Sequence, residues 1–287
     1  MKEFAEIRMS DKDYPNRLLN IPDPPETLYC IGDISLLKSK KSLAVVGSRK
    51  CSEYGRQVAQ KTGMTAAQNK VTVISGMANG IDTSAHLGTL KENGKTVAVL
   101  GTGVDVVYPR SNEMLYDEIS KKGLIVSEYP PGTRGTVFTF PQRNRIISGL
   151  SDGVAVIEAG PNSGALITAE LADRQGRTVF AVPGNITSPY SLGTNRLIMD
   201  GACPIAVIDD IFTELGFELR LTEDEKEELG DDEKVIFELL KQSGELTVDI
   251  ICDRTGFEAF KVTGLLTVME MKGLIANSLG RIFIAKF

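Results

Sequence analysis

The sequence predicts an α/β fold in which a doubly wound, mostly parallel sheet is followed by a small winged-helix domain. Short runs rich in β-branched residues alternate with longer helical patterns, and Gly or Ser ends nearly every run. Strands that are apolar on both faces and joined by helices indicate a parallel sheet covered on both sides. We expect six or seven strands, in "SLAVVGS", "VTVISG", "TVAVLG", "LIVSEY", "GVAVIEAG", "TVFAVPG" and "CPIAVI".

The 287 residues are expected to divide into four segments. Residues 1–40 contain the Pro-rich stretch "YPNRLLNIPDPPETLYCIGD", which predicts an extended segment packed on the main domain. Residues 41–217 would form the main domain, and the charged residues 218–230 an acidic linker. In residues 231–287, three helical patterns and a final hairpin are typical of a winged helix.

Composition excludes several classes of function. No stretch reaches the ~18 apolar residues of a membrane span, and the N-terminus lacks the apolar run of a signal peptide, so we expect a cytoplasmic protein with no membrane contact. Cys30, Cys51, Cys203 and Cys252 lie far apart, which indicates neither a zinc site nor a disulfide framework. The single histidine, His86, is expected on a helix surface.

The net charge of −6 disfavours nucleic acid as a partner, but the charge is unevenly distributed. Residues 221–287 hold 14 acidic and 8 basic residues, so the excess acid belongs to this part of the chain. The expected recognition helix of the winged domain carries Glu258, Lys261, Glu270 and Lys272, whereas a helix that reads duplex DNA is normally more basic. We therefore do not expect this domain to bind duplex DNA.

Small residues follow several of the expected strands, in "GSR" (47–49), "SGMANGID" (75–82), "GTG" (101–103) and "GPNSGA" (160–165). The carboxyl ends of parallel strands meet at one edge of the sheet, where the following helices point free N–H groups outward. These segments are therefore expected to line one anion-binding cleft. "GTG" lacks the third glycine of a dinucleotide fingerprint, and no acidic residue follows at the ribose-binding spacing, so no nicotinamide cofactor is expected.

Two arginines lie near the start of a helix that is expected to begin near Phe140. Pro141 suits the first helical position, and the buried stripe of the helix would be Ile146, Ile147 and Leu150. Arg143 would then lie in the first turn, where a cation opposes the helix dipole unless a bound anion faces it. The alternative is that Arg143 or Arg145 pairs with Glu158 or another acid at the sheet edge.

The stretch "VVGSRKCSEYG" supplies further phosphate-binding candidates. Gly47 permits close approach of the backbone, Ser48 can cap a helix or donate to a phosphate, and Arg49 can bind a phosphate with two hydrogen bonds. Ser75 and Gly76 place small groups and backbone amides at the end of the next strand. Asp82, a few residues on, is either part of this site or only a helix cap.

Six motifs occur in a fixed order: "VVGSRKCSEYG", "SGMANGIDTSAH", "AVLGTGVDVVYP", "SEYPPGT", "FPQRNRIISGLSDGVAVIEAGPNSGALITAELADRQGRTVFAVPGN" and "GTNRLIMDGA". Together they resemble the DprA/Smf family of DNA-processing proteins over roughly residues 14–210. The resemblance implies an extended Rossmann fold that binds single-stranded DNA, helps to load the RecA recombinase during natural transformation and recombination, and dimerises through the Rossmann domain. Such proteins are recombination mediators rather than known enzymes, and the resemblance implies neither a cofactor nor a metal.

Carried over to this sequence, the resemblance places bound DNA along two sets of residues. Phosphates are expected at Gly47, Ser48 and Arg49, at Ser75 and Gly76, and along "FPQRNR" and "PNSGA", which contain Arg143, Asn144, Arg145, Asn162, Ser163 and Gly164. A base is expected to stack on Phe140. One of the two arginines of "FPQRNR" would face phosphate, and the other would lock the cleft wall.

The sequence departs from the family pattern in two places. Many relatives carry an N-terminal helical domain before the "YP…LL" segment, for which we find no room here. Relatives also often carry a basic residue or a histidine just before "FP", where this chain has "GTRGTVFTFP". Arg134 is the expected substitute, with a weaker affinity for DNA than the tightest binders of the family.

Two other classes of function remain open. Nucleotide-processing phosphoribohydrolases of the same superfamily use a glycine-rich turn with a catalytic glutamate, and "GPNSGALITAE" partly resembles it, with Glu158 and Glu170 as a possible carboxylate pair. In this chain Pro161 and Asn162 replace the doubled glycine of that turn. A third hypothesis is an interaction scaffold in which the winged domain binds a partner.

Overall fold

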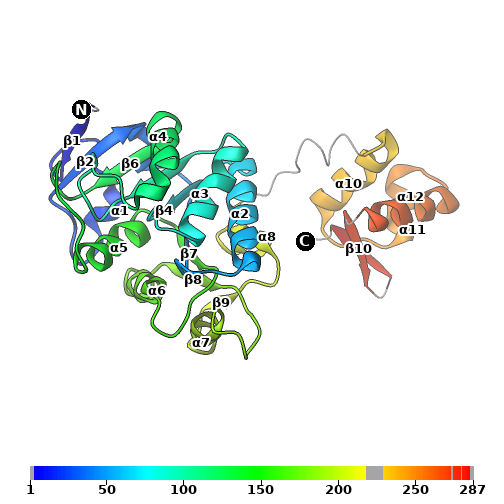
Figure 1. Cartoon of the computed structure of the whole chain (residues 1–287). Helices are drawn as coiled ribbons and strands as arrows, with labels where there is room; N and C mark the ends of the chain where they lie inside the picture. The colour runs from blue at the N-terminus through cyan, green and yellow to red at the C-terminus, as the bar shows by residue number, and fades with distance from the viewer. Residues whose placement is uncertain (1–2, 218–228, 273, 279, 285–287) are drawn as a thin grey trace. The chain divides into compact units, whose positions relative to one another are not determined.

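The computed structural model describes residues 3–217, 229–272, 274–278 and 280–284. The chain divides into two compact units, Met1–Glu218 and Leu219–Phe287, each of which has its own hydrophobic core (Figure 1). Most of the expected acidic linker, 218–230, lies outside the described residues.

Unit 1 is built on a sheet that has nine strands within the described residues, in the order β1-β2-β6-β5-β4-β3-β7-β8-β9. Seven of these strands, β3 to β9, are mutually parallel and lie side by side in the sheet. They coincide with the seven runs found in the sequence, which confirms the doubly wound α/β fold. Their bounds are Ser42–Val46 (β3), Thr72–Ser75 (β4), Thr96–Val99 (β5), Leu124–Ser127 (β6), Gly153–Val156 (β7), Thr178–Ala181 (β8) and Cys203–Pro204 (β9).

Helices cover both faces of the sheet because alternate residues of each strand point to opposite sides. In β5, Val97 and Val99 belong to one core cluster together with Ile146 of α5, whereas Ala98 belongs to another with Ile119 of α4. In Figure 1, α2, α3 and α4 form one layer, and α5 and α6 lie away from it. The helices of unit 1 are Asn16–Leu19 (α1), Glu53–Gln68 (α2), Ile81–Lys91 (α3), Glu113–Lys122 (α4), Thr139–Gly149 (α5), Gly164–Arg174 (α6), Leu192–Met199 (α7) and Ile208–Glu214 (α8).

The N-terminal segment contributes more than an extended chain. It forms β1 (Ala5–Arg8) and β2 (Thr27–Gly32), and β2 pairs antiparallel with β6. The sheet therefore has two strands more than the sequence predicted. The Pro-rich loop between these strands is held by a buried hydrogen bond of 2.6 Å from the Tyr14 hydroxyl to the Pro25 carbonyl, and by an ion pair of 2.8 Å between Arg17 and Asp152.

Unit 2 is a winged helix, as the sequence predicted. Three helices and a hairpin enclose a core that includes Ile236, Ile251, Val262 and Ile282. The elements are Asp231–Ser243 (α10), Val248–Thr255 (α11), Ala259–Met271 (α12), Ile275–Ser278 (β10) and Arg281–Ile284 (β11). Among the described residues, no helix is both long and apolar enough to span a membrane.

Candidate nucleic-acid interface

A cleft of about 780 Å³ lies at the carboxyl end of the parallel sheet. It opens between the segments that follow β3 and β7, which are neighbouring strands from which the chain winds in opposite directions. Such a switch point is where open α/β sheets bind ligands. We call this cavity the main cleft. It is lined by residues within 46–50, 137–147 and 160–168, and by Ala78, Asp82 and Tyr108.

The first wall is the "GSR" turn. Gly47 is required by close packing, because a Cβ there would lie 2.6 Å from Ile81 Cγ1 and 2.9 Å from the Glu158 carbonyl oxygen. The Ser48 hydroxyl donates to the Lys50 carbonyl at 2.7 Å, which shapes the turn. Arg49 is exposed, and within the described part of the chain it has no hydrogen bond and no ion pair. Its guanidinium is therefore available to an anion in the cleft.

Arg143 behaves differently, because it is buried. Its guanidinium donates to the Gly76 carbonyl at 2.8 Å and also to the Val99 carbonyl, and only 4% of the residue is exposed. Burial lowers the pKa of Arg143 to about 10, although the nearby charge of Asp82 opposes the shift. The side chain is thus still charged at neutral pH. Its Nε has no hydrogen-bond partner among the described residues, and the side chain reaches the main cleft.

Arg143 is the fifth residue of α5 rather than a first-turn residue, because the helix begins at Thr139. Pro141 consequently occupies the third helical position instead of the first, which is still a position without an intrahelical N–H bond. At the fifth position, the positive charge of Arg143 opposes the helix dipole less strongly than the sequence suggested, since the dipole effect falls off within the first turn.

Gly76 and Asp82 both lie next to Arg143, and Asp82 also lines the main cleft. A Cβ on Gly76 would lie 2.7 Å from both terminal nitrogens of Arg143, so only glycine lets the guanidinium approach. Asp82 accepts hydrogen bonds from the Gly76 and Ala78 amides at 3.1 and 3.3 Å, and burial raises its pKa. Ser75 is fully buried and donates to the Val45 carbonyl at 2.6 Å. Neither Ser75 nor the Gly76 amide can bind phosphate in this arrangement, which corrects that expectation.

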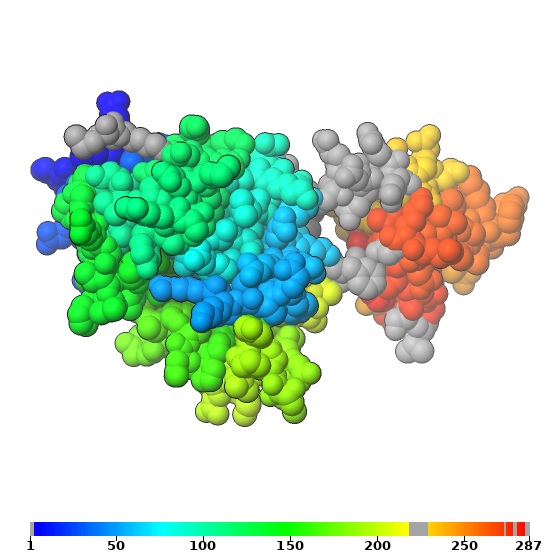
Figure 2. Space-filling view, viewed as in Figure 1, coloured from blue at the N-terminus to red at the C-terminus, as the bar shows by residue number. Residues whose placement is uncertain are grey.

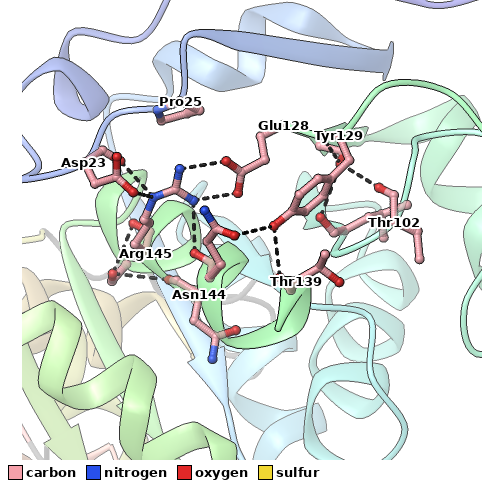
Figure 3. Close-up of polar contacts among 12 residues, drawn as sticks. Asp23, Pro25, Thr102, Glu128, Tyr129, Thr139, Asn144 and Arg145 are labelled. Carbon is pink, nitrogen blue, oxygen red and sulfur yellow. Dashed lines mark hydrogen bonds and ion pairs between the residues drawn. The ribbon is translucent and has the colours of Figure 1, made fainter. Parts of the chain in front are cut away.

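Arg145 does not line the main cleft, and its side chain binds acids outside it. Its guanidinium binds both carboxylate oxygens of Glu128, at 2.6 and 2.7 Å, and its Nε contacts Asp23 in the N-terminal loop (Figure 3). Burial alone would lower the pKa of Arg145, but the hydrogen bonds and charge of Glu128 outweigh it and raise the pKa. Arg145 therefore has the wall-locking position that was expected for one of the two arginines, and its partner is Glu128 rather than Glu158.

An aromatic pair forms the rim next to Arg49. The rings of Phe140 and Tyr108 have centroids 5.0 Å apart, and the Arg49 guanidinium lies 5.5 Å from the centroid of Phe140. Phe140 is half-buried, and Gly101 and Gly135 pack closely against its ring. A Cβ atom on either glycine would lie only 2.7 or 2.5 Å from the ring. Tyr108, with 49% of its surface exposed, presents the more open ring.

The second wall is the "PNSGA" turn, which begins α6. Asn162 and Gly164 are exposed, and Ser163 caps the helix by accepting from the Ala165 amide at 3.4 Å. Asn144 of α5 faces the same turn and donates to the Gly164 carbonyl at 3.3 Å. All four residues line the main cleft, whereas Arg134 is exposed on the loop before α5 and does not line it.

Two other expectations fail in the structure. His86 is fully buried instead of lying on a helix surface; its Nδ1 is 2.6 Å from Thr96 Oγ1, and burial lowers its pKa to about 3. Glu158 and Glu170 do not form a carboxylate pair. Glu158 is buried and accepts from the amide and hydroxyl of Ser52, whereas Glu170 is exposed and bonds to Arg174, and neither lines the main cleft.

Sequence reasoning missed Tyr108 and Lys50 as lining residues of the main cleft. Lys50 follows Arg49 directly, so its position beside a phosphate-binding candidate was an available signal. Tyr108 lies in an irregular loop between β5 and α4, and no periodic pattern marks such a residue. Within the described residues, no group of His, Cys, Asp or Glu could hold a metal ion.

Comparison with known proteins places both units in one family. The family model described as DNA recombination-mediator protein A matches residues 6–216, and the model described as the DprA winged helix domain matches residues 221–281. The DNA processing protein DprA of Streptococcus pneumoniae is 44% identical over 216 residues, which cover 75% of this chain and 76% of that protein. Protein Smf of Escherichia coli is 40% identical over 272 residues, which cover 92% of this chain and 72% of that protein.

Solved structures agree with this assignment. The structure of DNA processing protein A from Streptococcus pneumoniae superposes with a TM-score of 0.71 over 76% of each chain. A structure that describes the single-stranded DNA binding mode of DNA processing protein A from Helicobacter pylori superposes with a TM-score of 0.68, at 29% identity, over 77% of this chain and 100% of that chain. The protein described here therefore belongs to the DNA recombination-mediator protein A family, the DprA/Smf proteins.

Proposed function

We propose that this protein binds single-stranded DNA in the main cleft and promotes loading of the RecA recombinase onto it, in recombination and during natural transformation. The main support for DNA binding is the rim of the cleft, where Arg49, which has no ion pair among the described residues, lies beside the ring of Phe140, which in turn contacts Tyr108. A free guanidinium and an aromatic surface are the two elements of single-strand sites, one for phosphate and the other for a base.

The rest of the cleft supports the same ligand. Lys50 adds a second exposed cation, and the turn at Asn162 to Gly164 opens towards the first amides of α6, where anions bind favourably. Arg143 supplies positive charge from below without being exposed to solvent. The binding residues therefore belong to segments that begin at one edge of one sheet, and the sheet fixes their spacing.

Unit 2 is not part of the proposed DNA site. Lys261 forms an ion pair with Asp232 at 2.8 Å and Lys272 one with Glu233 at 2.9 Å, so each lysine of the α12 region lies beside an acid of α10. The exposed side chains of α12 include Phe260 and not an arginine. We propose that unit 2 contacts a protein partner and does not read duplex DNA.

We also propose a homodimer formed through unit 1. Support comes from the apolar side chains that unit 1 exposes around α7, where Ile186, Leu192 and Met199 are 82%, 45% and 78% exposed. Light scattering at micromolar concentration should give twice the 31.1 kDa of one chain. A mass of one chain would contradict this proposal.

The function is tested by two measurements on the full chain. Fluorescence anisotropy with labelled oligo-dT and with a duplex of the same length should show binding of the single strand in preference. In the second measurement, RecA ATPase activity on single strands coated with single-strand binding protein should begin sooner when this protein is present. Equal affinity for single strand and duplex would contradict the first part, and an unchanged lag in ATPase activity the second.

A further inference from the structure

A second cavity, of about 440 Å³, lies on unit 1 between the first turns of α2 and α3. The two helices pack side by side and form part of the exposed face of unit 1 (Figures 1 and 2). We call this cavity the α2–α3 groove; its lining includes Glu53, Arg56 and Gln60 from α2, and Asn79, Thr83 and Leu87 from the loop and helix of α3.

The groove adjoins the main cleft, because one residue lines both cavities. Arg49 borders the main cleft, the small cavity behind Phe140 and the α2–α3 groove. A strand that extends from the main cleft past Arg49 can therefore reach the groove. A mononucleotide would fill only the first cavity, whereas a longer strand can use both.

The floor of the groove is rigid because two glycines bring the helices into contact. A Cβ on Gly63 would lie 2.3 Å from the Ala85 carbonyl oxygen, and one on Gly88 would lie 2.1 Å from the Gln60 carbonyl oxygen. Side chains on facing turns of α2 and α3 are thus held at fixed separations. A surface that is already ordered loses less entropy when it binds a flexible strand.

The side chains of the groove offer a charge, amide donors and an apolar surface. Arg56 is 55% exposed, and its Nε lies 3.7 Å from Glu53, a separation too long for a good hydrogen bond and worth little in an exposed ion pair. The Gln60 side chain has no hydrogen bond in the described part of the chain, and the Asn79 side chain uses only its oxygen, which accepts from Ser111 at 3.0 Å. Leu87 is 45% exposed.

We propose that the α2–α3 groove is a second subsite for single-stranded DNA, in which Arg56 binds a phosphate and Leu87 packs against the adjoining sugar or base. Single-stranded DNA alternates charge with flat apolar surface, and the groove places a cation and an apolar side chain on facing helices. Glu53 competes with the phosphate for Arg56, which makes this subsite weaker than the main cleft. This inference rests on the proposed function and extends it.

The test is the length dependence of binding, measured by fluorescence anisotropy on the full chain. The probes are oligo-dT strands from about 4 to about 16 nucleotides, the range that single-strand sites cover. Arg56→Ala is compared with Arg174→Ala, an exposed arginine at the far end of α6 that also pairs with a glutamate of its own helix. Arg49→Ala reports on the main cleft.

Arg56→Ala should weaken binding of the longest strands by about three- to tenfold and leave the shortest strands unchanged. Its salt dependence should lose about 0.7 of a unit of slope, the value for one single-strand phosphate, again for long strands alone. Glu53→Gln removes the competing carboxylate and should tighten binding of the long strands only.

Three results would overturn the inference. Equal binding by Arg56→Ala and Arg174→Ala at every length would show that DNA does not enter the groove. An equal loss at every length would place Arg56 in the main cleft instead. An effect of Glu53→Gln that is absent or independent of length would show that Glu53 does not compete with a phosphate in the groove. If the wild-type protein binds none of the strands, the proposed function fails as well, and that outcome is recognised because Arg49→Ala then changes nothing.

Discussion

Replacing Arg49 by alanine should weaken DNA binding with little change in the stability of the fold. The side chain is exposed, and its guanidinium lies 5.5 Å from the centroid of the Phe140 ring. An exposed cation–π contact is worth about 0.5 to 1 kcal/mol, which sets the upper limit of the stability loss. A hydrogen-bonded phosphate contact is worth about 1.5 to 3 kcal/mol, so affinity should fall roughly 10- to 150-fold.

Two matched variants separate charge from geometry. Arg49→Lys keeps the positive charge but loses the fork of two donors, so it should retain the salt dependence and lose part of the affinity. Arg49→Ala should lose about 0.7 of a unit in the slope of log affinity against log salt. The assay is fluorescence anisotropy of labelled oligo-dT at several salt concentrations, and a thermal melt of each variant shows whether it is folded.

The reasoning is refuted if folded Arg49→Ala binds like wild type at every salt concentration. That result would mean that the main cleft is not where DNA phosphates bind, whatever the other arginines do. A loss of affinity with an unchanged slope would show instead that Arg49 supports the Phe140 ring and makes no phosphate contact.

Four further variants or conditions test other parts of the structure. Phe140→Ala should cost about 1 to 3 kcal/mol of binding with an unchanged salt slope, and because the ring is half-buried its thermal melt should also fall; unchanged binding by a folded variant would exclude stacking. Arg145→Met should destabilise the fold by about 3 to 5 kcal/mol in urea unfolding, because it leaves the largely buried Glu128 carboxylate without its partner. Adding Glu128→Gln should recover part of this loss. A cost below about 1 kcal/mol would contradict the prediction. Deletion of residues from Glu223 onward should leave single-strand affinity equal or slightly higher, since this acidic part of the chain repels phosphate, and a tenfold loss would show that unit 2 contacts DNA. Stability should fall as pH drops from about 6.5 towards 3, by up to about 1.4 kcal/mol per pH unit from His86 alone. The reason is that the pKa of His86 is about 3 in the folded protein, so the unfolded chain binds the proton first. A His86→Gln variant with the same pH profile would contradict this.

The parallel strands could be recognised in the sequence because each is a short apolar run that ends in Gly or Ser. The strand β1 could not, since its four residues "AEIR" include two exposed charged side chains and form no apolar run. Prolines before β2 made the whole N-terminal segment resemble a loop. Strands at the edge of a sheet depend on pairing with distant residues, here with β6 nearly a hundred positions later, and that pairing leaves little local signal.

At the site, residue types were easier to predict than residue roles. Arg143 and Arg145 are two positions apart on one helix, so they point in different directions, and the sequence alone does not say which one meets the cleft. The choice is made by Glu128 on a neighbouring strand end and by Asp23 in the N-terminal loop. His86 was assigned to the wrong face of α3 for the same reason, because Thr96, which it contacts, belongs to the next strand.

The contact between Asp23 and Arg145 links the N-terminal loop to α5, the helix that forms one wall of the main cleft. A proteolytic cut or a bound partner in the Pro-rich loop would remove one of the two carboxylates that hold Arg145. Glu128 and the buried Ile146 and Ile147 would still hold α5, so the loss would weaken the anchoring of the helix that carries Phe140 and not release it. The N-terminal loop thus contributes to the anchoring of α5 although it does not line the main cleft.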